Sequence, residues 1–151
     1  MQEKVIYNFF DDDDFLRISN KIREMEKITS GEIRVAIKED RPPLSSKKDI
    51  RELSIEEFNK LNMNETRDKT GILIYVILRS RMFYILADSG INKKVDQAVW
   101  DEVRNQIQDK FRVGYYAEGI IDGVQRVGEI LSNHFPIKAD DTNELSNKVV
   151  L

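Results

Sequence analysis

A run of seven residues without polar alternation, positions 72–78 (ILIYVIL), constrains the fold more than any other stretch of this chain. A strand with this pattern is buried on both faces, and such strands normally lie in α/β sheets whose faces are covered by helices. Residues 79–82 allow a tight reversal, and residues 83–87 (FYILA) predict a second strand rich in aromatic and aliphatic side chains. We therefore expect a β-hairpin at the centre of the hydrophobic core.

The position of the turn predicts the register of this hairpin. If residues 80–81 form the loop, Leu78 faces Phe83 and Leu73 faces Asp88. The second strand then brings the carboxylate of Asp88 back to the end of the sheet at which the first strand begins.

The length and charge of the chain exclude several classes of protein. With 151 residues, the chain is long enough to bury the core of one domain. Its 24 basic and 27 acidic residues give a net charge of −3 and are interspersed, which argues against nucleic-acid binding. There is no cysteine, which excludes disulfides, thiolate metal sites and cysteine nucleophiles.

The sequence shows none of the features of a signal peptide or a membrane span. Residues 1–10 lack a basic region followed by an apolar core, and residues 72–78 are too few to cross a bilayer. We expect a soluble, cytoplasmic protein with no transmembrane segment.

A βαβ unit is predicted to lead into the hairpin. Residues 32–38 (EIRVAIK) have the period-two pattern of a strand with one well-buried face. Residues 47–61 predict a helix, so the strands at 32–38 and 72–78 should run parallel with a right-handed connection. The expected architecture is a three-layer α/β/α sandwich, in which a small mixed sheet is flanked by about four helices, at residues 11–30, 47–61, 95–111 and 115–133.

Two of these helices carry further signals. The carboxylates at residues 11–14 stand where the first helix begins, and they complement the positive end of its dipole. Gly119, Gly123 and Gly128 lie inside the last helix at a cost of about 1 kcal/mol each relative to alanine. These glycines predict close packing against the sheet or the preceding helix.

The two ends of the chain are less regular. Residues 5–10 are compatible with a short edge strand or with an apolar lead-in that packs beneath the first helix. We assign residues 1–136 to a single domain and residues 137–151 to an extended tail. The tail ends in Val149, Val150 and Leu151, so we expect it to dock in part on the domain.

Three carboxylates are predicted to converge at one end of the sheet. Glu32 begins the first strand, Asp68 precedes the second and Asp88 follows the third. Two parallel strands begin at the end at which an antiparallel third strand finishes. Three negative charges there are unfavourable unless a cation offsets them, and Ca²⁺ and Mg²⁺ bind carboxylate oxygens. The sequence therefore predicts a weak Ca²⁺ or Mg²⁺ site.

The same acids have a simpler interpretation. Each carboxylate can cap a turn or pair with a neighbouring cation, for which Arg67, Lys69, Lys93 and Lys94 are available. On the residues alone both interpretations stay open. His134, the one histidine, is expected in the last turn of a helix, where a partial positive charge is favourable.

Five motifs, in their order and spacing, resemble the TPM domain family. They are residues 29–35 (TSGEIRV), 66–76 (TRDKTGILIYV), 87–91 (ADSGI), 116–119 (YAEG) and 134–136 (HFP). The chain is similar to the short, soluble bacterial branch, in which the domain stands alone. The resemblance implies an α/β/α sandwich and divalent-cation binding, and for plant thylakoid members an acid phosphatase activity. Glu32, Asp68 and Asp88 fall within the matching motifs.

Three functions follow as hypotheses. The first is a divalent-cation-binding domain with a regulatory or structural role. The second is a metal-dependent acid phosphomonoesterase, in which Arg67, Lys93 and Lys94 would hold the phosphate. The third is a protein-interaction module. We favour the first, because a phosphatase also needs a nucleophile or an activated water and no nucleophile is evident in the sequence.

Overall fold

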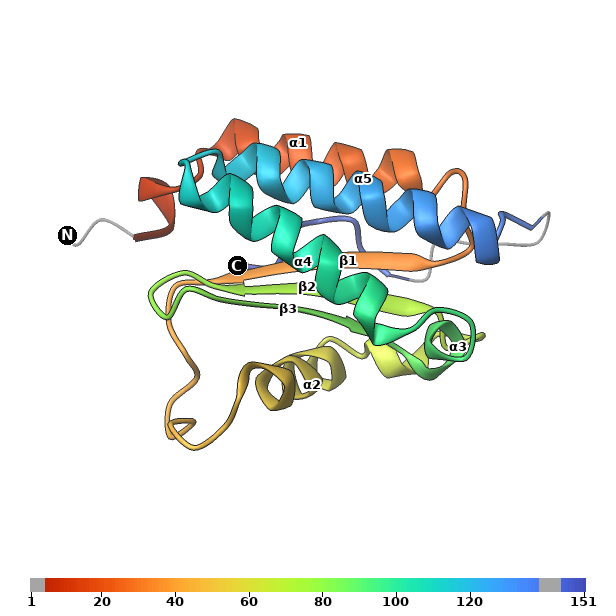
Figure 1. Ribbon diagram of the computed structural model, residues 1–151, viewed down its shortest axis with the longest axis horizontal. Coiled ribbons are helices and arrows are strands. Elements are labelled where there is room, and N and C mark those ends of the chain that lie inside the picture. The colour runs from red at the N-terminus through yellow and green to blue at the C-terminus, as the bar shows by residue number, and fades with distance from the viewer. Residues whose placement is uncertain (1–4, 139–144) are drawn as a thin grey trace.

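The computed structural model describes residues 5–138 and 145–151. Its centre is a three-stranded sheet with the strand order β1-β2-β3. Figure 1 shows this sheet between two layers of helices, with α1, α4 and α5 on one side and α2 on the other. The expected α/β/α sandwich is confirmed. The strands are β1 (Glu32–Lys38), β2 (Gly71–Ile77) and β3 (Met82–Ala87).

Four long helices form the outer layers, as expected, and the chain also forms short helical turns. The short α3 (Ser89–Asn92) comes one residue after β3. A 3₁₀ turn, Val5–Asn8, forms in the N-terminal segment, whose sequence is compatible with either an edge strand or an apolar lead-in. Ile6 and Phe10 of that segment are buried, so it is an apolar lead-in. The long helices are α1 (Asp12–Met25), α2 (Ile50–Lys60), α4 (Gln97–Arg112) and α5 (Tyr116–His134).

The strand pairing has the expected mixed topology but not the expected hairpin register. β1 runs parallel to β2, and β2 runs antiparallel to β3. Leu73 faces Leu86, whereas we predicted Asp88, and the prediction that Leu78 faces Phe83 is also wrong. The reason is the length of the turn: Ile77 and Met82 are the last pair of the hairpin, so four residues connect the strands where we predicted two.

The turn that replaces it has four residues, 78–81. The Arg81 amide donates to Leu78 O at 3.1 Å, and Arg81 has a positive φ of 51°. Left-handed backbone is uncommon for a residue other than glycine, so this turn has no clear sequence signal.

The acidic run at residues 11–14 begins α1, as predicted. Asp11 and Asp14 form a capping box: the Asp14 amide donates to Asp11 Oδ1 at 2.7 Å, and the Asp11 amide donates to Asp14 Oδ2 at 3.0 Å. The helix ends at Met25, five residues before the predicted end. Ile28, which lies within the predicted range of this helix, falls beyond its end and is 45% exposed.

The sheet divides the hydrophobic core into two parts. Side chains on one face of β2 pack against α1, α4 and α5. Those on the opposite face pack against α2, together with Leu53 and Phe58. All seven residues of β2 are buried. The prediction that this strand is buried on both faces is confirmed.

The glycines of α5 permit close helix packing. A Cβ atom on Gly123 would lie 2.6 Å from Cδ1 of Ile107 in α4, and one on Gly128 would lie 2.5 Å from Cβ of Met25 in α1. The packing prediction is confirmed for α4, and α1 is an additional partner that we did not predict.

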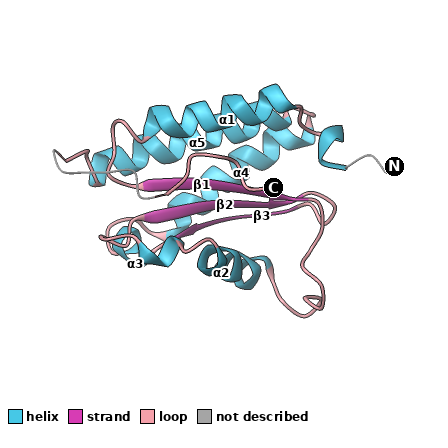
Figure 2. Cartoon of the chain, turned by 180° about the vertical axis from the view of Figure 1, so that it is seen from behind, coloured by secondary structure: helices cyan, strands magenta, loops and turns pink. Residues whose placement is uncertain are grey.

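The end of the chain docks on β1 beside the sheet (Figure 2). The Val150 amide donates to Val35 O at 2.9 Å, and Val150 O accepts from the Ile37 amide at 2.8 Å. Leu151 stays 56% exposed. Docking of the apolar end of the tail is confirmed, and the acidic part of the tail, residues 139–144, lies outside the described residues.

Candidate functional site

Backbone hydrogen bonds bring the three predicted acids to one end of the sheet. The Glu32 amide donates to Thr70 O at 2.9 Å, and the Asp88 amide donates to Gly71 O at 2.9 Å. Asp68 lies two residues before Thr70, in the loop that leads into β2. The main chain at these acids therefore meets around the start of β2, as the strand order requires.

The loop at residues 66–70 presents Asp68 at the surface. The side chain of Asp68 is 41% exposed, and its Oδ2 lies 3.3 Å from Arg67 Nη2 and 3.7 Å from Lys138 Nζ. Lys69 has a positive φ of 57°, and its ammonium group donates to Asn64 O. Both cations beside Asp68 are exposed, so these ion pairs are weak and exchangeable.

Gly90 holds this loop close to the segment that follows β3. Its amide donates to Lys69 O at 2.9 Å. A Cβ atom at position 90 would lie 2.4 Å from the carbonyl oxygen of Asp68 and 2.5 Å from that of Lys69. Only glycine allows this approach, so the two carbonyl groups are held beside the segment that begins with Asp88.

Asp88 has one satisfied and one unsatisfied carboxylate oxygen. Oδ1 accepts a hydrogen bond from the Ser89 amide at 2.7 Å and so caps α3. Oδ2 is buried and has no hydrogen-bond partner within residues 5–138 and 145–151. A buried carboxylate oxygen without a partner is costly, and each such atom in a native structure calls for an explanation such as a bound ion or water.

Glu32 has a different environment from the two aspartates. It is 4% exposed, and its carboxyl group is hydrogen-bonded to that of Glu26, the residue after α1. Glu26 Oε2 also accepts from the Ile33 amide at 2.8 Å. Burial raises the pKa of Glu26 to about 8, the Ile33 hydrogen bond opposes this rise, and the nearby charge of Glu32 adds to it. Glu26 and Glu32 therefore form a buried carboxyl pair, in which Glu26 keeps its proton to a higher pH than an ordinary glutamate does.

Our sequence reasoning missed Glu26, although a signal for it exists. Ile18, Ile22 and Glu26 are spaced by four residues, so the stripe that buries the two isoleucines also carries the glutamate toward the core. The acids do not form one cluster. Among the described residues, no group of three His, Cys, Asp or Glu side chains is arranged to hold a metal ion.

The three predicted phosphate-binding cations have different surroundings. Arg67 contacts Asp68, whereas Lys93 is exposed at the end of α3. Lys94 extends to the end of α5, where Nζ lies 4.8 Å from the ring centroid of Phe135 and 3.4 Å from His134 O. His134 is the last residue of α5, as predicted. The helix that follows Asp88 has only four residues, so it offers no extended N-terminus to an anion.

The comparisons with known proteins agree with this fold. The family model described as the TPM domain matches residues 6–130. The chain belongs to the TPM domain family. The structure of this TPM domain is similar to that of the BA42 protein from the psychrophilic bacterium Bizionia argentinensis, with 37% identity, 94% of each chain covered and a TM-score of 0.83.

A second solved structure has a similar fold. The N-terminal domain of a protein from P. gingivalis has 15% identity and a TM-score of 0.68, over 84% of this chain and 79% of that one. A search of curated proteins returned no match. Within the described part of this TPM domain, no helix is long and apolar enough to cross a membrane.

The oxygen atoms at this end of the TPM domain suit a hard, weakly held dication. Asp68 and Asp88 supply carboxylates, and Gly90 holds the carbonyl oxygens of residues 68 and 69 close by. Ca²⁺ and Mg²⁺ accept such oxygens together with water, while softer metals prefer nitrogen and sulfur ligands. The unsatisfied Oδ2 of Asp88 is the observation that most favours a cation.

Proposed function

We propose that this TPM domain binds a divalent cation, Ca²⁺ or Mg²⁺, at the end of the sheet where loop 66–70 meets Asp88, in a regulatory or structural role. Asp68 and Asp88 supply the charged oxygens, and backbone carbonyls and water complete the shell. The buried Oδ2 of Asp88, which has no partner in the described part of the chain, carries the proposal.

The role of Glu32 in this proposal is indirect. Its carboxyl group is buried and hydrogen-bonded to that of Glu26, so we assign it no ligand oxygen and only a contribution to the negative charge at this end of the sheet. With two carboxylates and neutral oxygens, binding should be weak, with a Kd on the order of 0.1 to 1 mM. Such an affinity suits a site that responds to the concentration of the free cation.

Thermal unfolding with and without cation tests the proposal. At about 100 times Kd, binding stabilises the folded state by about 2.7 kcal/mol, which raises the Tm of a domain of this size by roughly 5 to 10 °C. Chelator should reverse the rise. Asp88→Asn keeps a side-chain oxygen for the Ser89 amide but removes the charge, so it should raise the Tm of the metal-free protein and abolish the response.

Asp96→Asn is the matched control for this substitution. Asp96 also stands at the N-terminus of a helix, α4, but it is exposed and its side chain makes no cap hydrogen bond. It should respond to cation as the wild type does. A metal-free Tm that falls in Asp88→Asn, with the cation response intact, would show that Asp88 has a structural role only.

A metal-dependent acid phosphomonoesterase is the second candidate. One observation favours it: Arg67 and Lys138 both lie beside Oδ2 of Asp68, where they could hold a phosphoryl group next to the cation. The candidate predicts slow, cation-dependent hydrolysis of an aryl phosphate at mildly acid pH. Asp68→Asn and excess chelator should each abolish it, and activity that survives either one argues against this function.

A further inference from the structure

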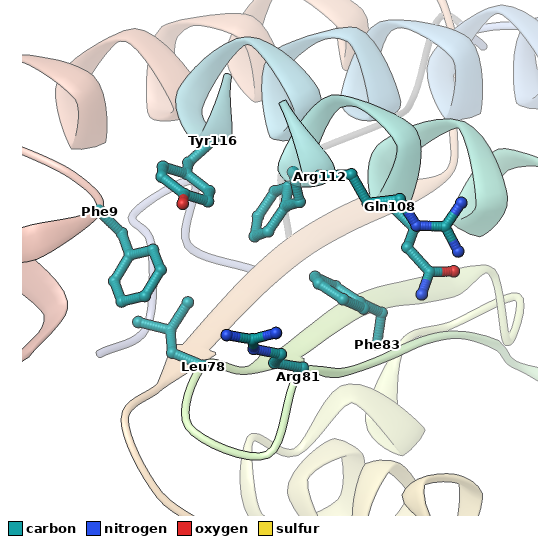
Figure 3. A pocket seen from close by; sticks show the side chains of 8 residues that line it. Phe9, Leu78, Arg81, Phe83, Gln108, Arg112 and Tyr116 are labelled. Carbon is teal, nitrogen blue, oxygen red and sulfur yellow. The ribbon is translucent and has the colours of Figure 1, made fainter. Parts of the chain in front are cut away.

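A pocket of about 470 Å³ lies at the hairpin end of the sheet, away from the acids. β2 has seven residues, so the two ends are about 20 Å apart at about 3.3 Å per residue. Figure 3 shows Tyr116 and Gln108 entering from the helices and Arg81 and Phe83 from the hairpin. The volume is within the range of pockets that hold small ligands, from about 300 to 1,000 Å³.

Four aromatic rings line this pocket. They follow one another nearly at right angles, with centroid distances of 4.7 Å from Phe9 to Tyr116, 5.2 Å from Tyr116 to Phe111 and 4.8 Å from Phe111 to Phe83. All four rings are only partly buried. An edge-to-face chain of this kind holds its rings in fixed orientations and leaves apolar surface for a further planar group.

Two guanidinium groups line the same pocket. Arg81 has no ion-pair partner among the described residues, and none of those that line the pocket is acidic. Arg112 pairs with Asp109 at 3.3 Å, but both side chains are about two-thirds exposed, at 67% and 71%, so this pair is easily exchanged. Guanidinium groups bind carboxylates and phosphates through two parallel hydrogen bonds. The pocket thus combines aromatic surface with the charge of Arg81, which is unpaired in the described part of the chain, and the exchangeably paired charge of Arg112.

We propose that this pocket is a second binding site, for a small aromatic anion that carries a phosphate or carboxylate on a planar ring. The ring packs on Phe83, Phe111 and Tyr116, and the anionic group binds Arg81. The guanidinium of Arg112 extends toward Gln108 (Figure 3), and its charge adds to the positive potential of the pocket. Gln108 adds an amide at the rim. The site is separate from the proposed cation site, and it requires neither a metal ion nor hydrolysis.

Titration by NMR tests this site in the presence of excess chelator, so that the cation site plays no part. The probes are phenyl phosphate and phenylacetate, with inorganic phosphate and benzyl alcohol as the two halves of the ligand. Either aromatic anion should shift amide signals of residues 78–83 and 108–116 saturably at millimolar concentration. Each half alone should bind at least about tenfold more weakly. The anion that binds more tightly, phosphate or carboxylate, defines the ligand class.

Two variants and a control locate the anion. Arg81→Gln and Arg112→Gln remove charge from exposed side chains. Arg81→Gln should weaken binding by about tenfold, the scale of one charged hydrogen bond, and Arg112→Gln should weaken it by less. Arg126→Gln removes an exposed arginine from the outer face of α5, and it should bind as the wild type does. The proposal is overturned if neither anion gives saturable shifts up to about 10 mM, if inorganic phosphate binds equally well, or if both pocket variants bind like the wild type.

Discussion

The amide of Gly90 donates to the carbonyl oxygen of Lys69 at 2.9 Å, and this bond joins the loop before β2 to the segment after β3. The contact holds because position 90 has no side chain. The geometry of the candidate cation site therefore depends on a residue that supplies no ligand oxygen itself.

Gly90→Ala should disrupt this junction. The added Cβ would lie 2.4 and 2.5 Å from two backbone oxygens, which cannot move as a flexible side chain can. We expect the free energy of unfolding to fall by about 2 to 4 kcal/mol, the scale of overpacking a tight site, as measured by urea denaturation. Ser89→Ala, at an exposed neighbour, is the control and should change little. A Gly90→Ala protein as stable as the wild type would mean that the loop moves aside without cost.

The carboxyl pair of Glu26 and Glu32 predicts a pH dependence of stability. The folded-state pKa of Glu26 is raised from 4.5 to about 8, so the folded protein holds a proton that the unfolded chain releases. Stability is then greatest below the ordinary pKa and falls as the pH rises toward 8. We expect a loss of about 1 to 3 kcal/mol between pH 5 and 8.

Glu26→Gln tests this prediction, because the amide keeps an oxygen for the Ile33 amide and a donor for Glu32. The variant should be more stable than the wild type at pH 8, and its stability should vary less between pH 5 and 8. Urea unfolding at several pH values measures both. Parallel pH profiles for the two proteins would show that Glu26 ionises normally in the fold.

Removal of residues 148–151 should expose the outer edge of β1. The deletion removes the two hydrogen bonds of Val150 and the partly buried side chains of Val149 and Val150. We expect a loss of about 1 to 3 kcal/mol of stability. Leu151→Ala is the control, since this side chain is 56% exposed. If the truncated protein has an unchanged Tm, the tail contributes nothing in solution.

The sequence predicted best the elements whose pattern arises from burial. The bounds of β1 were predicted correctly, since its alternation reflects one buried face, and the continuous apolar run of β2 reflects two. The hairpin register was missed because Arg81 adopts a backbone conformation that its residue type does not indicate. The end of α1 was missed because Ile28 continues the apolar spacing beyond the helix.

For the candidate site, only the position of the backbone at the three acids was predictable from the sequence. Strand order places Glu32, Asp68 and Asp88 at one end of the sheet, but side-chain partners decide what each acid does there. Glu32 pairs with Glu26, a residue from another element, and this contact depends on where α1 ends. The aromatic pocket was not predicted, because its rings come from four segments that only the tertiary fold brings together.

The most direct test of the proposed function is an NMR titration of the wild type and Asp88→Asn with CaCl₂. We expect saturable shifts of the wild-type amides at residues 66–70 and 88–92, with a Kd on the order of 0.1 to 1 mM. We expect little change at the hairpin turn, and no saturable shifts in Asp88→Asn. Wild-type shifts that stay linear up to about 10 mM, or shifts in Asp88→Asn equal to those of the wild type, would contradict the proposed function.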